Sequence, residues 1–425
     1  MSVRFYNCKL LTMTDGIKIE DGELWVEGNR ITHVGTVKEQ REEKQWDREL
    51  DCKGNLLMPG FKDAHTHSPM TFLRSYADDL PLLSWLNDQV FPMEAKLTKE
   101  DVYCFSKLAI MEYLTSGITS NFDMYYFTQQ NVQASVDTGF RTVLTSGLND
   151  FQSSIEEVEA EYLTYNNYHE RISYKFGFHA EYTTSRALLE KLADLAHKYQ
   201  APVYTHNSES LSEVQQCIGR NGMTPTVYLN KLGLFEFGGG GFHCVHMSEE
   251  DLEIFREKGL YVVTNPGSNV KLASGIAPLE KMLELGIELG IGTDGPASNN
   301  CLDMFREMFL ATGLQKLKYQ DASALKAESV LYMAVSGGAK AMGLTECDTL
   351  AEGKLADLIL IDLNQPNMQP VNNIAKNIVY SGSKSNVKLT MVNGKILYED
   401  GRFDIGADPG DLYKEANDRV SRIKE

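Results

Sequence analysis

The sequence predicts an α/β protein, in which a (β/α)₈ barrel of the TIM type is joined to a small β-sandwich. Three observations lead to this prediction. Eight short apolar runs alternate with longer helical stretches between residues 57 and 349. Both ends of the chain instead contain short alternating segments punctuated by turn glycines. The length of 425 residues suffices for one large and one smaller domain.

The barrel is predicted from the order of its elements. The expected strands are the runs NLLMPGF, SNFDMYY, RTVLTSG, ISYKFGF, APVYTHN, GGFHCVH, LYVVTNP and IELGIGTDG. Stretches such as SRALLEKLADLAHKYQ and SEEDLEIFREKG between them have helical periodicity, and Ser248 is expected to cap the latter. Parallel strands need such crossovers, and eight of them favour a closed barrel. An open doubly wound sheet is the alternative, but no Gly-rich phosphate loop follows an early strand. The four glycines 238–241 are expected to form a flexible loop.

The two ends of the chain are expected to build the β-sandwich together. Residues 1–56 contain VRFYNCKLL and GELWVEGNRITHVG, and the same style resumes from about residue 350 with ADLILIDL, KLTMVNG and KILYEDG. We therefore predict a composite domain of residues 1–56 plus 350–425, with the barrel of residues 57–349 inserted. The final stretch, DLYKEANDRVSRIKE, is expected to be an amphipathic surface helix.

Composition limits the classes of partner and the location. A formal net charge of −18 argues against nucleic acid and against an anionic membrane surface. The first residues lack signal-peptide architecture, and no apolar run approaches a membrane span. Seven cysteines without scaffold spacing suggest reduced thiols. We expect a cytoplasmic enzyme.

Most of the nine histidines fall where a barrel carries its chemistry, at the carboxyl ends of strands. His65 and His67 follow the first expected strand and share one parity, so their side chains point the same way. The others at strand ends are His179, His206 and His243, with Asp294 after the eighth strand. In contrast, His33, His169 and His197 lie in ordinary surface contexts. The joint placement predicts a metal site.

The predicted ligands are His65, His67, His206 and Asp294. Three nitrogens and one oxygen suit a single Zn²⁺, with Fe²⁺ as the alternative, and leave a position open for water. A second metal would need a bridging ligand at the end of the fourth strand. Lys175 lies four residues before His179, deep in the barrel or at its opposite mouth, so we predict one metal.

Several motifs together resemble those of the amidohydrolase superfamily, and within it the 5′-methylthioadenosine/S-adenosylhomocysteine deaminases. They are LMPGFKDAHTH, THNSE, HCVHMSEED, NPGSNVKLASGIAP and GTDGPASNNCLDMFREM. The resemblance covers essentially the whole chain. It implies a metal-dependent hydrolase that converts the adenine ring of a nucleoside to hypoxanthine and releases ammonia. The implied partner is a small purine nucleoside, and dimers or other homo-oligomers are common among such enzymes.

The resemblance also implies roles for individual residues. Glu209, three residues after His206, would shuttle protons, while His243 and Asp294 would orient water and stabilise charge. Glu94 matches a glutamate that binds ribose hydroxyls, and His179 matches a substrate-contacting histidine; Glu209 and Asp294 would touch the substrate as well. Trp85 is a candidate pocket wall or core residue, and we assign His246 to structure.

The chain departs from the family pattern at two positions. Ser146 stands where an arginine is common, and Glu181 where proline is usual. An arginine would pair with an amino-acid carboxylate, so its absence favours methylthioadenosine or adenosine over S-adenosylhomocysteine.

Three alternatives remain open from the sequence. They are a deaminase of guanine or another free base, a triazine-type amino- or chlorohydrolase, and a non-catalytic barrel subunit. Free-base deaminases usually carry H-x-H-x-P-Q where this chain has HTHSPM.

Overall fold

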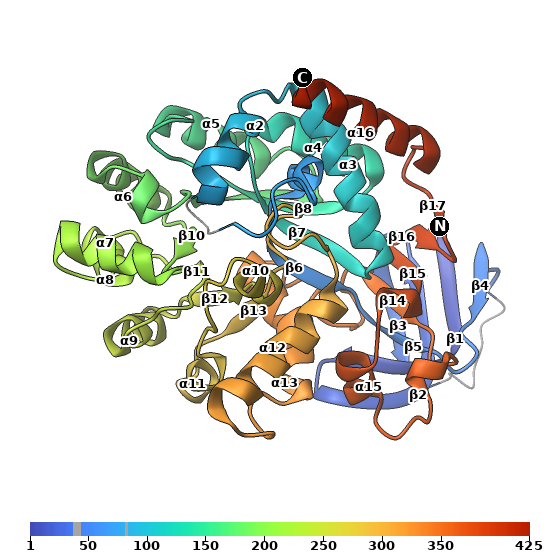
Figure 1. Cartoon of the computed structure of the whole chain (residues 1–425). Coiled ribbons are helices and arrows are strands. Elements are labelled where there is room, and N and C mark those ends of the chain that lie inside the picture. The colour runs from blue at the N-terminus through green and yellow to red at the C-terminus, as the bar shows by residue number, and fades with distance from the viewer. Residues whose placement is uncertain (37–43, 81–83) are drawn as a thin grey trace.

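The computed structural model describes residues 1–36, 44–80 and 84–425, and it confirms the predicted barrel. Eight parallel strands follow one another in chain order, with helices outside them (Figure 1). The strands are β6 (Phe61–Thr66), β7 (Ile118–Met124), β8 (Arg141–Thr145), β9 (Ile172–Gly177), β10 (Val203–Asn207), β11 (Gly239–His243), β12 (Tyr261–Thr264) and β13 (Leu289–Ile291). The first and last strands meet where the Asp294 N–H donates to the His65 carbonyl at 3.0 Å.

Helices of varied length connect and cover these strands. The longer ones are α3 (Lys99–Thr115), α4 (Thr128–Thr138), α5 (Ile155–Tyr165), α6 (Arg186–Tyr199), α7 (Leu211–Asn221), α9 (Glu249–Lys258) and α12 (Met304–Tyr319). The shorter ones are α8 (Pro225–Lys231), α10 (Pro266–Lys271), α11 (Leu279–Glu284), α13 (Ala327–Tyr332), η4 (Met333–Gly337) and α14 (Gly338–Met342). The predicted Ser248 cap is confirmed: its hydroxyl accepts from the Asp251 N–H, and the Asp251 carboxylate accepts from the Ser248 N–H.

The segment between β6 and α3 forms a wall beside the barrel mouth. It contains η1 (Ser68–Leu73), η2 (Trp85–Val90) and α2 (Phe91–Glu94), and the helical turn η3 (Glu181–Thr183) follows β9. No helix among the described residues combines the length and apolar character that crossing a membrane requires.

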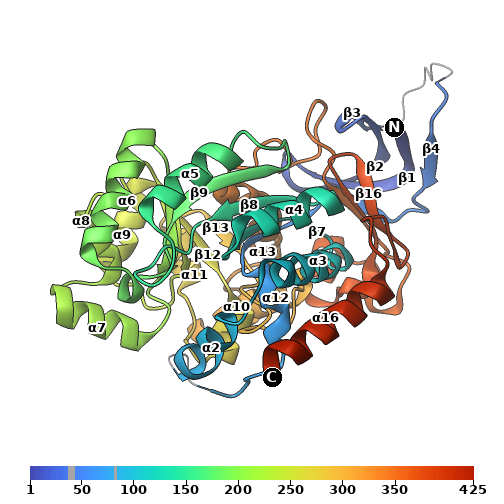
Figure 2. The ribbon, with the colours of Figure 1, turned by 90° about the horizontal axis from the view of Figure 1, so that it is seen from above.

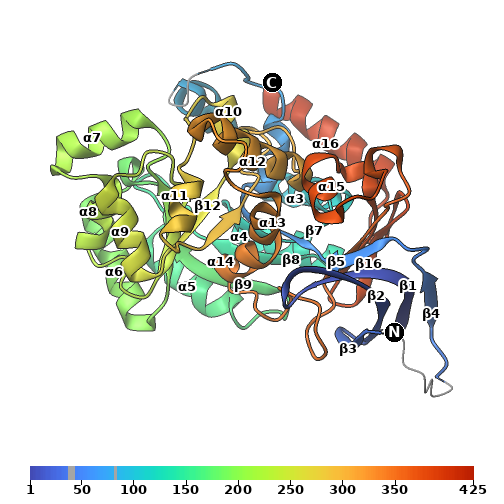
Figure 3. The ribbon, with the colours of Figure 1, turned by 90° about the horizontal axis from the view of Figure 1, so that it is seen from below.

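Both ends of the chain contribute strands to one nine-stranded sheet beside the barrel (Figure 3). Its strands are β1 (Ser2–Met13), β2 (Gly16–Glu27), β3 (Arg30–Gly35), β4 (Arg48–Asp51), β5 (Leu56–Pro59), β14 (Leu358–Ile361), β15 (Val387–Val392), β16 (Lys395–Glu399) and β17 (Arg402–Phe403). Leu358 and Leu360 enter a core of this sheet's own, whereas Ile359 and Ile361 join the main core beside the barrel. Alternate residues of β14 thus point to opposite faces of the sheet, and both faces are buried.

The run NLLMPGF, expected as the first barrel strand, is divided between the two sheets. Leu56–Pro59 is β5, which pairs with β14 and β1 in the terminal sheet. The chain re-enters hydrogen bonding at Phe61, so β6 is the first barrel strand and His65 lies within it. A continuous apolar run cannot reveal such a division, because both halves are fully buried. The exact domain limits stay a prediction.

The glycine run 238–241 was wrongly expected to be a flexible loop. Gly239, Gly240 and Gly241 are residues of β11. A Cβ on Gly239 would lie 1.9 Å from the Val203 carbonyl oxygen, and one on Gly240 would lie 2.3 Å from that of Tyr261. The glycines therefore allow β11 to approach its two neighbouring strands.

The predicted C-terminal helix is α16 (Pro409–Lys424), which lies along α3 (Figure 2). Its apolar side buries Leu412 and Ile423, and Arg419 and Arg422 pair with Asp101 of α3. The remaining helices of the C-terminal region are η5 (Pro366–Met368), α15 (Ile374–Tyr380) and η6 (Lys384–Asn386).

Candidate active site

The strand ends of the barrel bring the predicted site residues to one place. His65 and His67 lie at the end of β6, His206 in β10 and His243 at the end of β11, while Asp294 follows β13. His243 and Asp294 have left-handed backbones, with φ of 68° and 58°. Such conformations are costly for residues other than glycine and cluster at functional sites.

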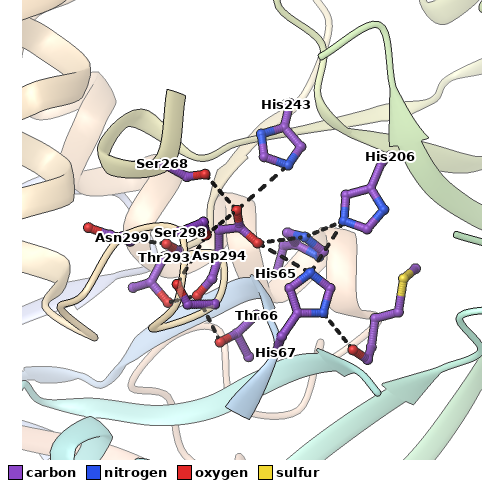
Figure 4. Close-up of polar contacts among 12 residues, drawn as sticks. His65, Thr66, His67, His206, His243, Ser268, Thr293, Asp294, Ser298 and Asn299 are labelled. Carbon is purple, nitrogen blue, oxygen red and sulfur yellow. Dashed lines mark hydrogen bonds and ion pairs between the residues drawn. The ribbon is translucent and has the colours of Figure 1, made fainter. Parts of the chain in front are cut away.

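Side-chain atoms of His65, His67, His206 and Asp294 converge at the strand ends, with four separations of 3.1–3.5 Å among them (Figure 4). The Nε2 atom of His206 lies 3.1 Å from that of His65 and 3.3 Å from that of His67. Asp294 Oδ1 lies 3.2 Å from His67 Nε2 and 3.5 Å from His65 Nε2. His243 is a more distant neighbour, since its ligand atom falls within a 4.8 Å group with those of His65, His206 and Asp294.

These separations fit a divalent metal ion. A tetrahedral site with metal–nitrogen bonds of 2.0–2.1 Å has ligand atoms about 3.4 Å apart. The Nδ1 atoms of two of these histidines donate to backbone carbonyls, His67 to Met124 at 2.6 Å and His206 to His179 at 2.7 Å. That tautomer turns the Nε2 lone pairs inward, where only a cation or a proton can satisfy them.

The charge states agree with this interpretation. Burial lowers the pKa of His65 to about 3, which keeps the imidazole in the neutral form that binds metal. Burial also opposes protonation of His67, but the hydrogen bond with Asp294 raises its pKa to about 9. Positive charge is therefore favoured beside the Asp294 carboxylate.

The second oxygen of Asp294 is held by two serine hydroxyls. Ser268 donates to Oδ2 at 2.6 Å and Ser298 donates to it at 2.7 Å. His243 Nε2 lies 4.0 Å from the same oxygen, and its Nδ1 donates to Asn269 Oδ1 at 2.8 Å. His243 Nε2 thus faces the space beside Asp294 with its tautomer fixed.

Glu209 is a second carboxylate near His243 Nε2. Its Oε2 is 3.8 Å from His243 Nε2, and its Oε1 accepts from the Ser274 hydroxyl at 3.2 Å. Burial raises the pKa of the Glu209 carboxyl. Glu213 positions this loop, because its carboxylate accepts from the backbone N–H groups of Ser208 at 3.0 Å and Glu209 at 2.8 Å.

A cavity opens from these residues and reaches the wall segment. Glu94, Trp85 and His179 line it, together with Glu209 and Asp294. Glu94 is buried and accepts from the Tyr125 hydroxyl at 2.7 Å, and burial raises its pKa to about 7. His179 Nδ1 contacts the Thr183 hydroxyl at 2.9 Å.

Residues at the margins of the site have other partners. The Ser146 hydroxyl accepts from the Leu148 N–H at 2.9 Å, and Glu181 pairs with Arg220. Lys175 Nζ lies beside Gly343, away from the four converging atoms. His246 Nε2 donates to the Ser274 carbonyl at 2.7 Å, which fits the structural role expected for it.

His33 differs from expectation, because it is buried rather than a surface residue. Its ring packs against that of Trp25, with centroids 4.8 Å apart, and its Nδ1 lies 3.3 Å from a Glu352 carboxylate oxygen.

The sequence reasoning missed the polar residues that support the site. They are Tyr125, Ser268, Asn269, Ser274, Ser298 and Asn299. Most of them lie in NPGSNVKLASG and GTDGPASNN, directly after the seventh and eighth strands. Their position at strand ends was the available signal.

Comparisons with known proteins place this geometry in context. The profile of the amidohydrolase family matches residues 56–397. A 5-methylthioadenosine/S-adenosylhomocysteine deaminase from Caldanaerobacter subterraneus subsp. tengcongensis is 39% identical over 407 residues, covering 94% of this chain and 93% of its own. The zinc-bound structure of an adenosine deaminase from Xanthomonas campestris is 30% identical, with a TM-score of 0.92 and coverage of 100% and 98%. A zinc complex of atrazine chlorohydrolase from Arthrobacter aurescens TC1, at 22% identity and TM-score 0.89 over 98% and 100% of the chains, shares the fold.

Proposed function

Because the chain belongs to the amidohydrolase family, we propose that it is a metal-dependent deaminase of an adenine nucleoside. Water and the nucleoside would give the hypoxanthine product and ammonia. The observation that carries the proposal is the convergence of three histidine Nε2 atoms and Asp294 Oδ1 beside a buried glutamate, Glu209. The relatives named as deaminases of methylthioadenosine, S-adenosylhomocysteine and adenosine support the choice of reaction.

His65, His67, His206 and Asp294 would hold the metal ion, for which we propose Zn²⁺. Two structural neighbours contain zinc, and the nitrogen-rich donor set suits it, although Fe²⁺ has similar preferences. A divalent ion in this position would act as a Lewis acid that makes water acidic enough to attack at neutral pH.

The protein's own residues would manage the protons. Attack at C6 of the purine requires a proton on N1 and removal of one from water. Burial raises the Glu209 pKa, which favours the protonated form that would deliver a proton to N1. Asp294, acting as a base, would accept the proton from water, and His243 would stabilise the charge that develops on the attacking oxygen.

The part of the cavity that Glu94 and His179 line would bind the sugar. Glu94 Oε1 accepts from Tyr125, which leaves Oε2 to accept from a ribose hydroxyl. His179 lines the same region. We propose that these two residues, with Glu209 and Asp294, form the substrate contacts.

A neighbouring cavity would receive the 5′-substituent. Its described lining includes Phe91, Tyr126 and Phe151, and Glu94 is the one acidic side chain among the described lining residues. No lysine or arginine lies among these described lining residues. Aromatic faces suit a methylthio group, whereas an amino-acid carboxylate would find no cation. We therefore propose methylthioadenosine or adenosine as the substrate ahead of S-adenosylhomocysteine.

A substrate screen tests the function. Ammonia release should be measured with methylthioadenosine, adenosine, S-adenosylhomocysteine, adenine and guanine, and both ammonia and chloride release with a chlorotriazine. Highest kcat/KM on an adenine nucleoside supports the proposal. Preference for a free base, preference for the triazine, or inactivity on all six compounds would replace it with one of the three alternatives.

The location and the assembly state stay predictions. All seven cysteines are unpaired, which supports a reducing, cytoplasmic environment. A homo-oligomer remains an expectation, to be measured by light scattering.

A further inference from the structure

Glu307 is a buried carboxylate that the proposed reaction does not use. It lies in α12 with 0% exposure, and burial raises its pKa to about 8. Its Oε2 accepts from the Gly267 N–H at 2.7 Å, and its Oε1 accepts from Asn299 Nδ2 at 2.8 Å. No ion pair to Glu307 is found within the described ranges. A buried acid without a cation is costly, so its two hydrogen bonds indicate a specific role.

The two donors belong to separate turns at the barrel mouth. We call residues 265–269, which form the start of α10, the β12 turn, and residues 292–300 the β13 turn. Gly267 is in the β12 turn and precedes Ser268, which donates to Asp294 Oδ2. Asn299 is in the β13 turn, follows Ser298, and also donates to the Thr293 carbonyl at 2.7 Å. One carboxylate therefore joins the two turns that hold Asp294.

The contact between Glu307 and the β12 turn leaves no room for a side chain. A Cβ on Gly267 would lie 2.4 Å from Glu307 Oε1 and 2.6 Å from Asn299 Oδ1. Glycine at this position lets the backbone approach the carboxylate directly. The β12 turn also carries Asn269, which fixes the tautomer of His243.

We propose that Glu307 is a positioning residue for the reaction, joining the two turns so that Ser268 and Ser298 keep Asp294 Oδ2 hydrogen-bonded. With Oδ2 held by two hydroxyls, Oδ1 is directed at His65 and His67, where water would be activated. Displacement of about 1 Å in such a group can cost roughly a hundredfold in rate. The inference rests on the proposed deaminase function, because it assigns Asp294 a part in catalysis.

Glu307→Gln tests the role with little change in volume. The new amide places an NH₂ group against one of two N–H donors, so it can hold only one turn. We expect kcat to fall about tenfold or more, while KM changes less than about twofold and metal content stays the same. A loss of thermal stability with unchanged kcat would overturn the proposal.

Glu23→Gln is the matched control. Glu23 is also a buried carboxylate, accepting from Arg4 Nε at 3.0 Å and Nη2 at 2.6 Å, but it lies in the terminal sheet. This variant should lose stability and keep its kcat. Both variants are assayed well below their unfolding temperatures.

A double-mutant cycle separates positioning from general damage. If Glu307 acts through the serines, Glu307→Gln should lower kcat little further in a Ser268→Ala/Ser298→Ala background. Full additivity of the two kcat losses would overturn the proposal. Should Glu307→Gln fail to fold, Glu307→Asp keeps the carboxyl group, shortens the side chain and enters the same cycle.

The cycle uses whichever substrate the screen identifies. An active enzyme that fails the cycle refutes only the role of Glu307, whereas a protein inactive on all adenine nucleosides refutes the proposed function.

Discussion

The Tyr125 hydroxyl donates a 2.7 Å hydrogen bond to Glu94 Oε1, and both residues line the cavity that the histidine cluster also lines. The bond fixes the carboxylate and leaves its second oxygen for a ligand. Glu94 thus lies where the sugar of a nucleoside would be bound if the purine faces the metal site.

Replacing Glu94 should separate nucleosides from free bases. Hydrogen bonds to a charged group contribute roughly 1.5–3 kcal/mol, so Glu94→Ala should raise KM for adenosine tenfold or more. 2′-Deoxyadenosine should be a poorer substrate of the unmutated enzyme, and the variant should narrow that gap. The kcat/KM for adenine, which has no ribose, should be nearly unchanged by the substitution. The measurement is kcat/KM for the three compounds with both proteins, and equal losses on all three would make Glu94 structural.

Glu94 should also make stability depend on pH. Burial raises its pKa from 4.5 to about 7, so ionisation is opposed in the folded state. The contribution of protonated Glu94 to the free energy of unfolding is fully present below pH 4.5. It is lost as the pH rises through about 7, and this loss is on the order of 3 kcal/mol. Glu94→Gln should therefore raise Tm at pH 8 relative to the parent and change it little near pH 4.5. Exposed Glu190→Gln is the control, and equal effects of Glu94→Gln at both pH values would contradict the prediction.

Metal content should depend on His206. The purified protein should contain about one divalent ion per chain, and His206→Ala should lose both metal and activity. His197→Ala, at an exposed position of α6, should keep both metal and activity. Elemental analysis beside a deaminase assay makes the measurement. A content near two ions per fully active chain would refute the single-metal site.

Glu209 should matter for turnover and not for metal binding. Its carboxylate oxygens contact Ser274 and approach His243, outside the four converging ligand atoms. Glu209→Gln should retain metal while lowering kcat by roughly a hundredfold or more, because proton transfer is lost. If metal loss accounts for the whole defect, the shuttle role is wrong.

The glycines of β11 should tolerate no side chain. Gly239 has φ of 118°, and an added Cβ would meet the Val203 carbonyl oxygen at 1.9 Å. Gly239→Ala should be strongly destabilised or fail to fold. Gly313→Ala, in α12 with nothing within 4 Å of the added atom, should be neutral or stabilising by about 0.5–1 kcal/mol. Thermal unfolding of both variants is the measurement, and a Gly239→Ala protein as stable as the parent would contradict the close packing.

The sequence by itself determined the alternation of strands and helices and the positions of the site histidines at strand ends. The alternation of strands and helices follows from local hydrophobic periodicity. The grouping of the histidines follows from the geometry of parallel barrels, because the carboxyl ends of all strands lie on one face. His65, His206 and Asp294 could thus be grouped although they are far apart in the chain.

Only the tertiary structure decided which sheet each buried run joins and what surrounds each site residue. Leu56–Pro59 and Phe61–Thr66 are equally buried, so hydropathy could not assign them to different sheets. The glycines of β11 were mistaken for a loop. Glycine is required there because the backbones of the neighbouring strands, which are distant in sequence, pack too closely for a Cβ atom. The same holds for Glu307, whose two partners lie in separate turns. Contacts of this kind depend on three-dimensional proximity, which local sequence patterns do not contain.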